Sequence, residues 1–125
     1  FPGGNGSAKN LFTYALEGQH CTVREDVAKV ISAFHAAGKP VGALCIAPVM
    51  IAKVLGNVTI TVGSEPGTIA NVETFGTKHE ITVQKGVCAD KANKIFTTPC
   101  YMLPARISDI ADCADNLVKE MLKVM

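Results

Sequence analysis

The stretch that most constrains the fold of this chain is residues 39–48, where an apolar run ends at a cysteine and a helical pattern starts directly after it. Residues 41–44 follow a Gly-Lys-Pro stop signal and suit a parallel strand covered on both faces. From Ala47 the apolar residues are dense enough for a mostly buried helix. Pro48 fits the first turn of that helix, where a missing N–H costs nothing. The sequence therefore predicts a strand, a tight turn and a helix in immediate succession.

Cys45 lies at the corner between the predicted strand and helix. Nucleophile elbows have this layout, because a sharp strand-to-helix turn lifts the reactive atom above the sheet. The turn is crowded, and the residues two before and two after the cysteine are small, Ala43 and Ala47. The positive end of a helix dipole also favours a thiolate. The alternative is a buried structural cysteine, and the spacing alone leaves both interpretations open.

Composition restricts the class of protein. The chain has 125 residues, enough for about one domain, and a net charge of +1, so no basic surplus points to nucleic acid. Its longest apolar run, residues 43–52, is about half of a membrane span and contains a proline. The 5 cysteines include no C-x-x-C pair, which argues against a disulfide framework and a zinc site. We therefore expect no metal, no nucleic-acid partner and no membrane partner, in a reducing compartment.

Local patterns place the other elements. A glycine-rich loop opens the chain and leads into a helix, with a poor match to a dinucleotide fingerprint. Thr22 and Glu25 form a capping box that predicts a helix closed by Gly38. A further helix begins at about Pro104, with Ile107, Leu117 and other apolar residues on one face and Cys113 among the packing residues. The remaining predicted elements are strands at 58–62, 81–83, 87–89 and 94–98 and a short helix at 69–75.

Strands that alternate with helices predict a single α/β domain with a mainly parallel sheet. In such sheets, ligands bind beyond the carboxyl ends of the strands. The loop containing Gly3 and Gly4, Cys45, and the corner at residues 97–99 all lie at strand ends, so we expect them to share one face. This convergence favours the functional interpretation of Cys45.

Four segments together resemble one protein family. Residues 1–11 (FPGGNGSAKNL), 35–40 (HAAGKP), 45–48 (CIAP) and 93–99 (NKIFTTP) resemble the ElbB-like proteins, the enhancing-lycopene-biosynthesis or isoprenoid-biosynthesis group. That group belongs to the ThiJ/PfpI branch of the class-I glutamine amidotransferase-like superfamily. The resemblance runs through essentially the whole chain. It implies a flavodoxin-like three-layer sandwich, with residues 1–125 as the C-terminal portion of a domain whose first strands lie upstream.

The resemblance also assigns site residues. It makes Cys45 the nucleophile, with oxyanion-binding backbone groups from Gly3, Gly4 and the N–H of Ile46. Hydrolytic relatives have histidine where this chain has Ile46, so no Cys-His pair is supplied locally, and glutamine amidotransferase activity is disfavoured. The general base would be an acidic residue upstream of Phe1.

The function implied is a glyoxalase-type or deglycase-type conversion of small α-oxoaldehydes to hydroxy acids through a cysteine hemithioacetal, without a cofactor. The alternative is a non-catalytic redox-sensing or partner-binding protein linked to isoprenoid metabolism. His79, Thr98 and Cys100 are secondary site candidates, although His79 also fits a purely structural place beside a strand. From the family we expect a homodimer that is cytoplasmic, or mitochondrial in a eukaryote.

Overall fold

The computed structural model describes residues 1–125, and its central element is a three-stranded sheet in the order β1-β5-β4. Strand β1 (Val41–Leu44) pairs in parallel with β5 (Ile95–Thr98), and β5 forms an antiparallel hairpin with β4 (Cys88–Asp90). A second, two-stranded parallel sheet joins β2 (Thr59–Ile60) to β3 (Lys78–His79). Since two of the three pairings are parallel, the predicted α/β class with a mainly parallel sheet is confirmed.

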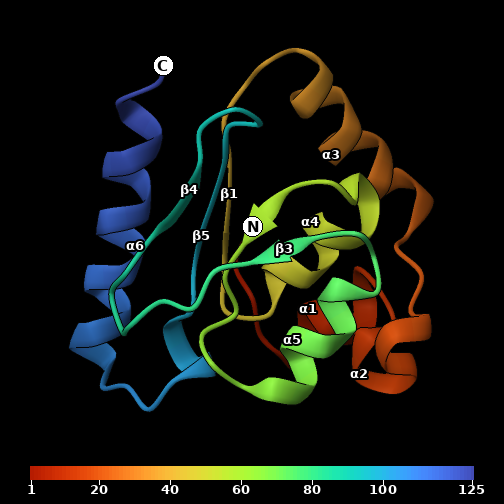
Figure 1. The fold of residues 1–125 in the computed structure, drawn as a ribbon, viewed down its shortest axis with the longest axis horizontal. Coiled ribbons are helices and arrows are strands. Elements are labelled where there is room, and N and C mark those ends of the chain that lie inside the picture. The colour runs from red at the N-terminus through yellow and green to blue at the C-terminus, as the bar shows by residue number, and fades with distance from the viewer.

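Helices cover both faces of the larger sheet, which gives three layers (Figure 1). Helix α6 (Ile107–Leu122) lies on one side, and α3 (Glu25–Ala36) and α4 (Ala47–Leu55) lie on the other. The remaining helical elements are α1 (Asn5–Asn10), α2 (Tyr14–Glu17), η1 (Gly18–His20), α5 (Pro66–Glu73) and η2 (Cys100–Met102). No helix is both long and apolar enough to cross a membrane.

Glycine at position 42 allows α6 to approach the sheet closely. A Cβ on Gly42 would lie 2.6 Å from Sδ of Met121 and 3.2 Å from Cδ2 of Leu117. The helix therefore packs against bare backbone on β1. On the opposite face, α4 fills the core, and its first six residues are all buried.

Two hydrogen bonds link the small sheet to the large one. The buried N–H of Thr61, just after β2, donates to Oγ1 of Thr97 in β5 at 2.9 Å. The N–H of Thr59 donates to Oδ2 of Asp90 at the end of β4, at 2.8 Å. These side-chain acceptors satisfy backbone donors that no strand pairs, so the two sheets act as one scaffold.

The predicted capping box at Thr22 is wrong, because α3 begins at Glu25 after an N-cap at Arg24. The backbone of Thr22 is already engaged: its carbonyl accepts the N–H of Thr13 at 3.0 Å, beside an isolated bridge between Phe12 and Val23. That long-range pairing holds Thr22 outside the helix. The predicted end of the helix is confirmed, since Gly38 takes φ +69° and its N–H donates to the carbonyl of His35.

The predicted strand at 81–83 is also wrong. Pairing with β2 ends when the N–H of Glu80 donates to the carbonyl of Ile60 at 2.9 Å. Beyond that point no strand lies alongside, and Ile81 and Val83 are 70% and 77% exposed. Their β-branched side chains favour a strand locally, but an extended segment without a neighbour forms no ladder.

Two predicted helices are present but differ in detail: α5 starts earlier than predicted, and α6 buries a different side. Helix α5 starts at Pro66, three residues before the predicted start at position 69, because the Glu65 carboxylate accepts the N–H groups of Gly67 and Thr68 at 2.8 and 2.6 Å. In α6 the buried face is centred on Cys113 and Leu117, whereas Ile107 is 81% exposed.

Candidate active site

Cys45 occupies the predicted strand-to-helix elbow. It lies between the end of β1 and the start of α4, with φ +61°, a left-handed conformation that is rare for a residue with a side chain. Ala43 and Ala47, two residues to either side, are fully buried. The N–H of Cys45 donates to the carbonyl of Thr98 at 3.0 Å, which ties the elbow to the end of β5. A strained turn held by such a bond is typical of a nucleophile elbow.

The first loop packs directly on this elbow. A Cβ on Gly3 would lie 2.7 Å from Cβ of Cys45, 2.8 Å from the carbonyl oxygen of Leu44 and 3.0 Å from the nitrogen of Ile46. Only glycine allows this approach. Gly4 follows with φ +99°, which again favours glycine.

The hydroxyl of Ser7 holds the loop in place from within α1. It donates to the carbonyl oxygen of Gly3 at 3.1 Å and to that of Pro2 at 3.2 Å. These carbonyls are therefore turned toward α1. The predicted proximity of Gly3 and Ile46 to Cys45 thus exists in the structure, whereas their role as oxyanion donors stays a prediction.

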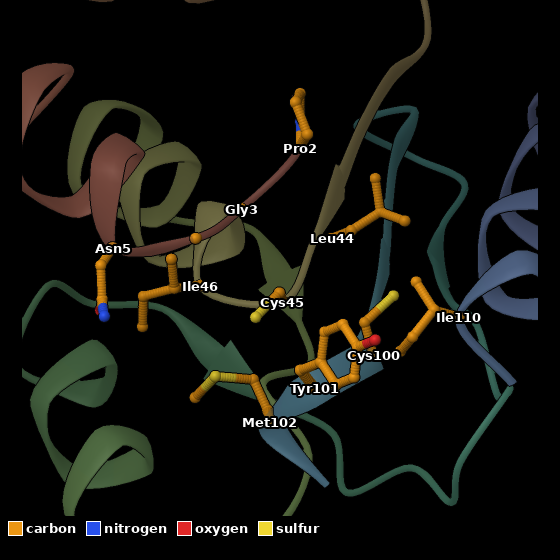
Figure 2. A pocket seen from close by; sticks show the side chains of 11 residues that line it. Pro2, Gly3, Asn5, Leu44, Cys45, Ile46, Cys100, Tyr101, Met102 and Ile110 are labelled. Atoms are coloured by element: carbon orange, nitrogen blue, oxygen red, sulfur yellow. The ribbon is translucent and has the colours of Figure 1, made fainter. Parts of the chain in front are cut away.

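A cavity of about 500 Å³ opens beside the elbow (Figure 2). Its lining comes from the first loop, the elbow, η2 and α6: Pro2, Gly3, Gly4, Asn5, Leu44, Cys45, Ile46, Cys100, Tyr101, Met102 and Ile110. The lining contains no carboxylate and no imidazole. The cavity thus supplies a thiol, backbone groups and apolar walls, but not the base that proton transfer requires.

The two cysteines of the cavity differ in environment. Cys45 is half-buried, whereas Cys100 is only 2% exposed. Burial, followed by the neighbouring Cys113 thiol, raises the pKa of Cys100 to about 12. Because the thiolate is the nucleophile, Cys100 is a poor nucleophile at neutral pH. No group of histidine, cysteine and acidic side chains is arranged to hold a metal ion.

The secondary candidates take three different places. Cys100 lines the cavity. Thr98 does not line the cavity: its carbonyl accepts the N–H of Cys45, and its buried hydroxyl donates to the carbonyl of Gly86 at 2.8 Å. His79 does not line the cavity, because its Nε2 accepts the N–H of Val62 at 2.9 Å in the small sheet. Burial lowers the pKa of His79, consistent with a neutral, structural imidazole.

Sequence reasoning missed the wall of the cavity opposite the first loop. That wall consists of Tyr101 and Met102 in η2 and Ile110 in α6. The η2 turn depends on Cys100 in a left-handed conformation, with φ +46°. No residue pattern around position 100 predicts that conformation. For Ile110 the sequence indicates only an apolar position of the C-terminal helix.

Comparison with family models returned no match. Among curated proteins, the chain is 40% identical over 133 residues to human "Glutamine amidotransferase-like class 1 domain-containing protein 3, mitochondrial", covering 99% of this chain and 50% of the relative. It is 30% identical over 138 residues to zebrafish (Danio rerio) "ES1 protein, mitochondrial", covering 99% of this chain and 51% of that protein. The chain therefore spans about half the length of the curated relatives it matches.

A solved structure shows the same fold. The isoprenoid biosynthesis protein with amidotransferase-like domain from Ehrlichia chaffeensis superposes with a TM-score of 0.84 at 21% identity, covering 98% of this chain and 57% of that one. The expected flavodoxin-like architecture is thereby confirmed. The chain is thus similar in sequence to a glutamine amidotransferase-like class 1 domain protein over about half of that protein's length, and it adopts an amidotransferase-like fold.

Proposed function

We propose that this chain carries the nucleophile of a cofactor-independent glyoxalase-type or deglycase-type enzyme that converts small α-oxoaldehydes to hydroxy acids. The observation that carries the proposal is the geometry of Cys45. Its thiol stands on a left-handed elbow at a helix N-terminus and borders a cavity of about 500 Å³. A small dicarbonyl compound fits a cavity of this size with room to spare.

The first chemical step uses groups that this chain provides. The Cys45 thiolate attacks the aldehyde carbon, and the carbonyl oxygen becomes the oxyanion of a hemithioacetal. The backbone N–H groups of Gly3, Gly4 and Ile46 are the proposed donors to that oxygen. In other enzymes one such donor contributes roughly 3 kcal/mol to the transition state.

The second step needs a group that the cavity lacks. A base removes the proton from the carbon of the hemithioacetal and delivers a proton to the adjacent carbonyl carbon, which yields a 2-hydroxyacyl thioester. Water then releases the hydroxy acid and regenerates the Cys45 thiol. We propose that the base is a carboxylate upstream of Phe1, so this chain alone forms the hemithioacetal but turns over weakly or not at all.

We further propose that residues 1–125 are the C-terminal portion of a larger domain. Strand β1 lies at the edge of its sheet, and on its free side only Phe1 pairs with it. The Phe1 amino group donates to the carbonyl of Gly42 at 2.7 Å, and the Phe1 carbonyl accepts the N–H of Leu44 at 3.1 Å. This is the start of a parallel ladder. Half-exposed Val30 and Val118 flank the same edge, so a preceding strand joined to Phe1 would be covered on both faces.

A second function stays open because of the same thiol. A non-catalytic redox-sensing or partner-binding protein also needs an accessible cysteine, and the name of the Ehrlichia protein supports the expected link to isoprenoid metabolism. The names of the curated relatives likewise favour a mitochondrial location for this chain. The ElbB-like assignment and the homodimer remain predictions.

The covalent step can be tested on this chain directly. After incubation with glyoxal, intact-mass and peptide mass spectrometry should show one added glyoxal on Cys45 and none in Cys45→Ser. Cys21→Ser, which removes a buried cysteine outside the cavity, is the control and should retain the adduct. An adduct that persists in Cys45→Ser would refute the assignment of the nucleophile.

Turnover requires the polypeptide at full length. We expect hydroxy acid formation from glyoxal to disappear in Cys45→Ser. Adduct formation without turnover in the full-length wild type would instead favour the sensing function.

A further inference from the structure

Two further cysteines lie behind the reactive one, and the glyoxalase-type chemistry uses neither. Cys100 lines the cavity between Cys45 and Ile110 (Figure 2). Cys113 is fully buried one helical turn after Ile110, on the same face of α6. The N–H of Cys45 donates to the carbonyl of Thr98, two residues before Cys100, and besides burial the thiols of Cys113 and Cys45 both contribute to the raised pKa of Cys100. Cys100 is therefore the middle member of a row that runs from the cavity into the protein.

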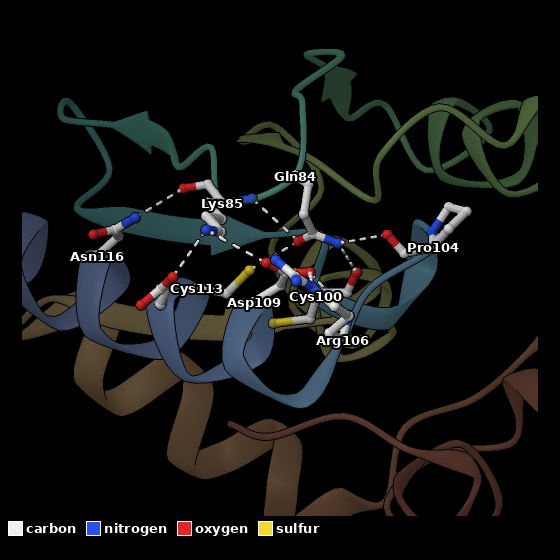
Figure 3. Close-up of polar contacts among 9 residues, drawn as sticks. Gln84, Lys85, Cys100, Pro104, Arg106, Asp109, Cys113 and Asn116 are labelled. Carbon is white, nitrogen blue, oxygen red and sulfur yellow. Dashed lines mark hydrogen bonds and ion pairs between the residues drawn. The ribbon is translucent and has the colours of Figure 1, made fainter.

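The side chain of Gln84 holds the inner part of this row together (Figure 3). Its Nε2 donates to the carbonyl oxygen of Cys100 at 3.1 Å and to that of Pro104 at 3.3 Å. Its Oε1 accepts the thiol of Cys113 at 3.0 Å. One carboxamide thus binds η2 and α6 at once and fixes Cys113 beside Cys100.

The three thiols differ in accessibility. Cys45 faces the cavity and is half-buried, while Cys100 and Cys113 are 2% and 0% exposed. An oxidant that enters the cavity meets Cys45 first. Cys100 stays protonated at neutral pH and so reacts slowly with peroxide by itself.

We propose that Cys45, Cys100 and Cys113 form a thiol relay that moves oxidation from the reactive cysteine to a buried Cys100–Cys113 disulfide when the protein meets a peroxide. The proposal rests on Cys45 being the reactive thiol of the proposed function, but on no particular aldehyde substrate. It assigns an oxidative modification site to Cys100 and Cys113.

The steps balance with hydrogen peroxide as oxidant. Cys45–SH and H₂O₂ give Cys45–SOH and water. The Cys100 thiol, after rotation of its side chain, attacks the sulfenic sulfur and gives its proton to the departing hydroxyl, which leaves as a second water, and a Cys45–Cys100 disulfide forms. Because the two cysteines are held side by side, this attack needs only a small thiolate fraction, unlike the reaction of Cys100 with free peroxide. Cys113 then attacks the Cys100 sulfur, and Cys45 leaves as the free thiol. In total, two thiols lose two electrons and two protons, H₂O₂ becomes two waters, and Cys45 is ready to react again.

The relay predicts where oxidation stops in each variant after one molar equivalent of H₂O₂, followed by thiol blocking and peptide mass spectrometry. In the wild type we expect a Cys100–Cys113 disulfide and free Cys45. In Cys113→Ser the reaction should stop at a Cys45–Cys100 disulfide. In Cys100→Ser the reaction should stop at Cys45 sulfenic acid after one equivalent, and further equivalents of peroxide should drive Cys45 to sulfinic acid. Cys100→Ala is the second variant if the first fails to fold. Cys88→Ser, which removes a buried cysteine outside the row, should behave as the wild type.

Two results would overturn the relay. One is Cys45 sulfinic acid in the wild type at the rate seen in Cys100→Ser. The other is a Cys100–Cys113 disulfide that forms equally fast in Cys45→Ser, because Cys45 would then not be the thiol that reacts first with the oxidant. A parallel glyoxal incubation separates this proposal from the previous one. If Cys45 takes up glyoxal but no disulfide forms, only the relay fails; if Cys45 reacts with neither reagent, the nucleophile assignment fails as well.

Discussion

Replacement of Gly3 by alanine should destabilise the protein, because the elbow leaves no space for a methyl group. The new Cβ would lie 2.7 Å from Cβ of Cys45, 2.8 Å from the carbonyl oxygen of Leu44 and 3.0 Å from the nitrogen of Ile46. All three are backbone atoms or a Cβ, so none can yield by rotation of a side chain. The first loop must move instead.

Overpacking of this kind costs about 1–3 kcal/mol. Taking about 2 kcal/mol, and about 4 °C for each kcal/mol in a domain of this size, we expect the melting temperature to fall by roughly 8 °C. The same displacement moves the N–H of Gly3 away from Cys45, so formation of the glyoxal adduct should also decrease. Thermal unfolding followed by circular dichroism and the mass-spectrometric adduct assay measure the two effects.

Gly6→Ala is the matched control. Gly6 lies in α1, and its added Cβ would have no atom within 4 Å. Alanine favours a helix over glycine by about 0.5–1 kcal/mol, so this variant should be as stable as the wild type or slightly more stable. A Gly3→Ala protein that melts within about 2 °C of the wild type and keeps its full glyoxal adduct would refute the close packing of loop and elbow.

Three further changes test other contacts. Thr97→Val leaves the buried N–H of Thr61 without its acceptor and should lower the free energy of unfolding in urea by about 1–3 kcal/mol, whereas an unchanged midpoint would contradict the link between the sheets. Gly42→Ala places a Cβ 2.6 Å from Sδ of Met121 and should be destabilising, and the added substitution Met121→Ala should restore part of the loss; strictly additive effects would argue against this contact. Burial, followed by the charge of Glu80, raises the pKa of Cys88 from 9.0 to about 12, so the folded state holds this proton more tightly than the unfolded state, and stability falls as pH rises from 9 toward 12, by up to about 4 kcal/mol. Cys88→Ala should flatten that part of the pH profile, and an identical slope in both proteins would contradict the shift.

The elbow could be predicted from the sequence because its signals are local. The apolar run at 41–44, the small residues around Cys45 and Pro48 at the start of α4 all act within ten positions. Steric crowding at a strand-to-helix turn leaves few alternatives for such a sequence. The strands predicted at 87–89 and 94–98, which form the β4–β5 hairpin, were found for the same reason, because their signals are also local.

The errors arose where distant contacts outweighed local preference. Thr22 has the right residue type and spacing for an N-cap, but the pairing of Phe12 with Val23 fixes its backbone elsewhere. Ile81 and Val83 favour a strand but have no strand beside them. Pattern reasoning on a single sequence contains no information about which segment will be a neighbour.

The cavity, too, was predictable only where its residues carry local signals. Its thiol and glycine loop lie at strand ends and could be anticipated from topology. Its opposite wall depends on the left-handed Cys100 and on Gln84, whose carboxamide joins η2 to α6. A glutamine after an exposed segment carries no signal of that role. The place of Cys113 behind the wall likewise follows from the packing of α6 on the sheet, not from its own helix pattern.

The reactivity of Cys45 is the claim on which both proposals depend, and selective alkylation tests it most directly. The folded protein is treated with less than one molar equivalent of iodoacetamide at neutral pH, and each of the five cysteine peptides is quantified by mass spectrometry. We predict that Cys45 takes up nearly all of the label, since the other four thiols are buried and those of Cys21, Cys88 and Cys100 have raised pKa values. Equal labelling of the five cysteines, or preferential labelling of any other, would contradict the assignment of Cys45 as the nucleophile.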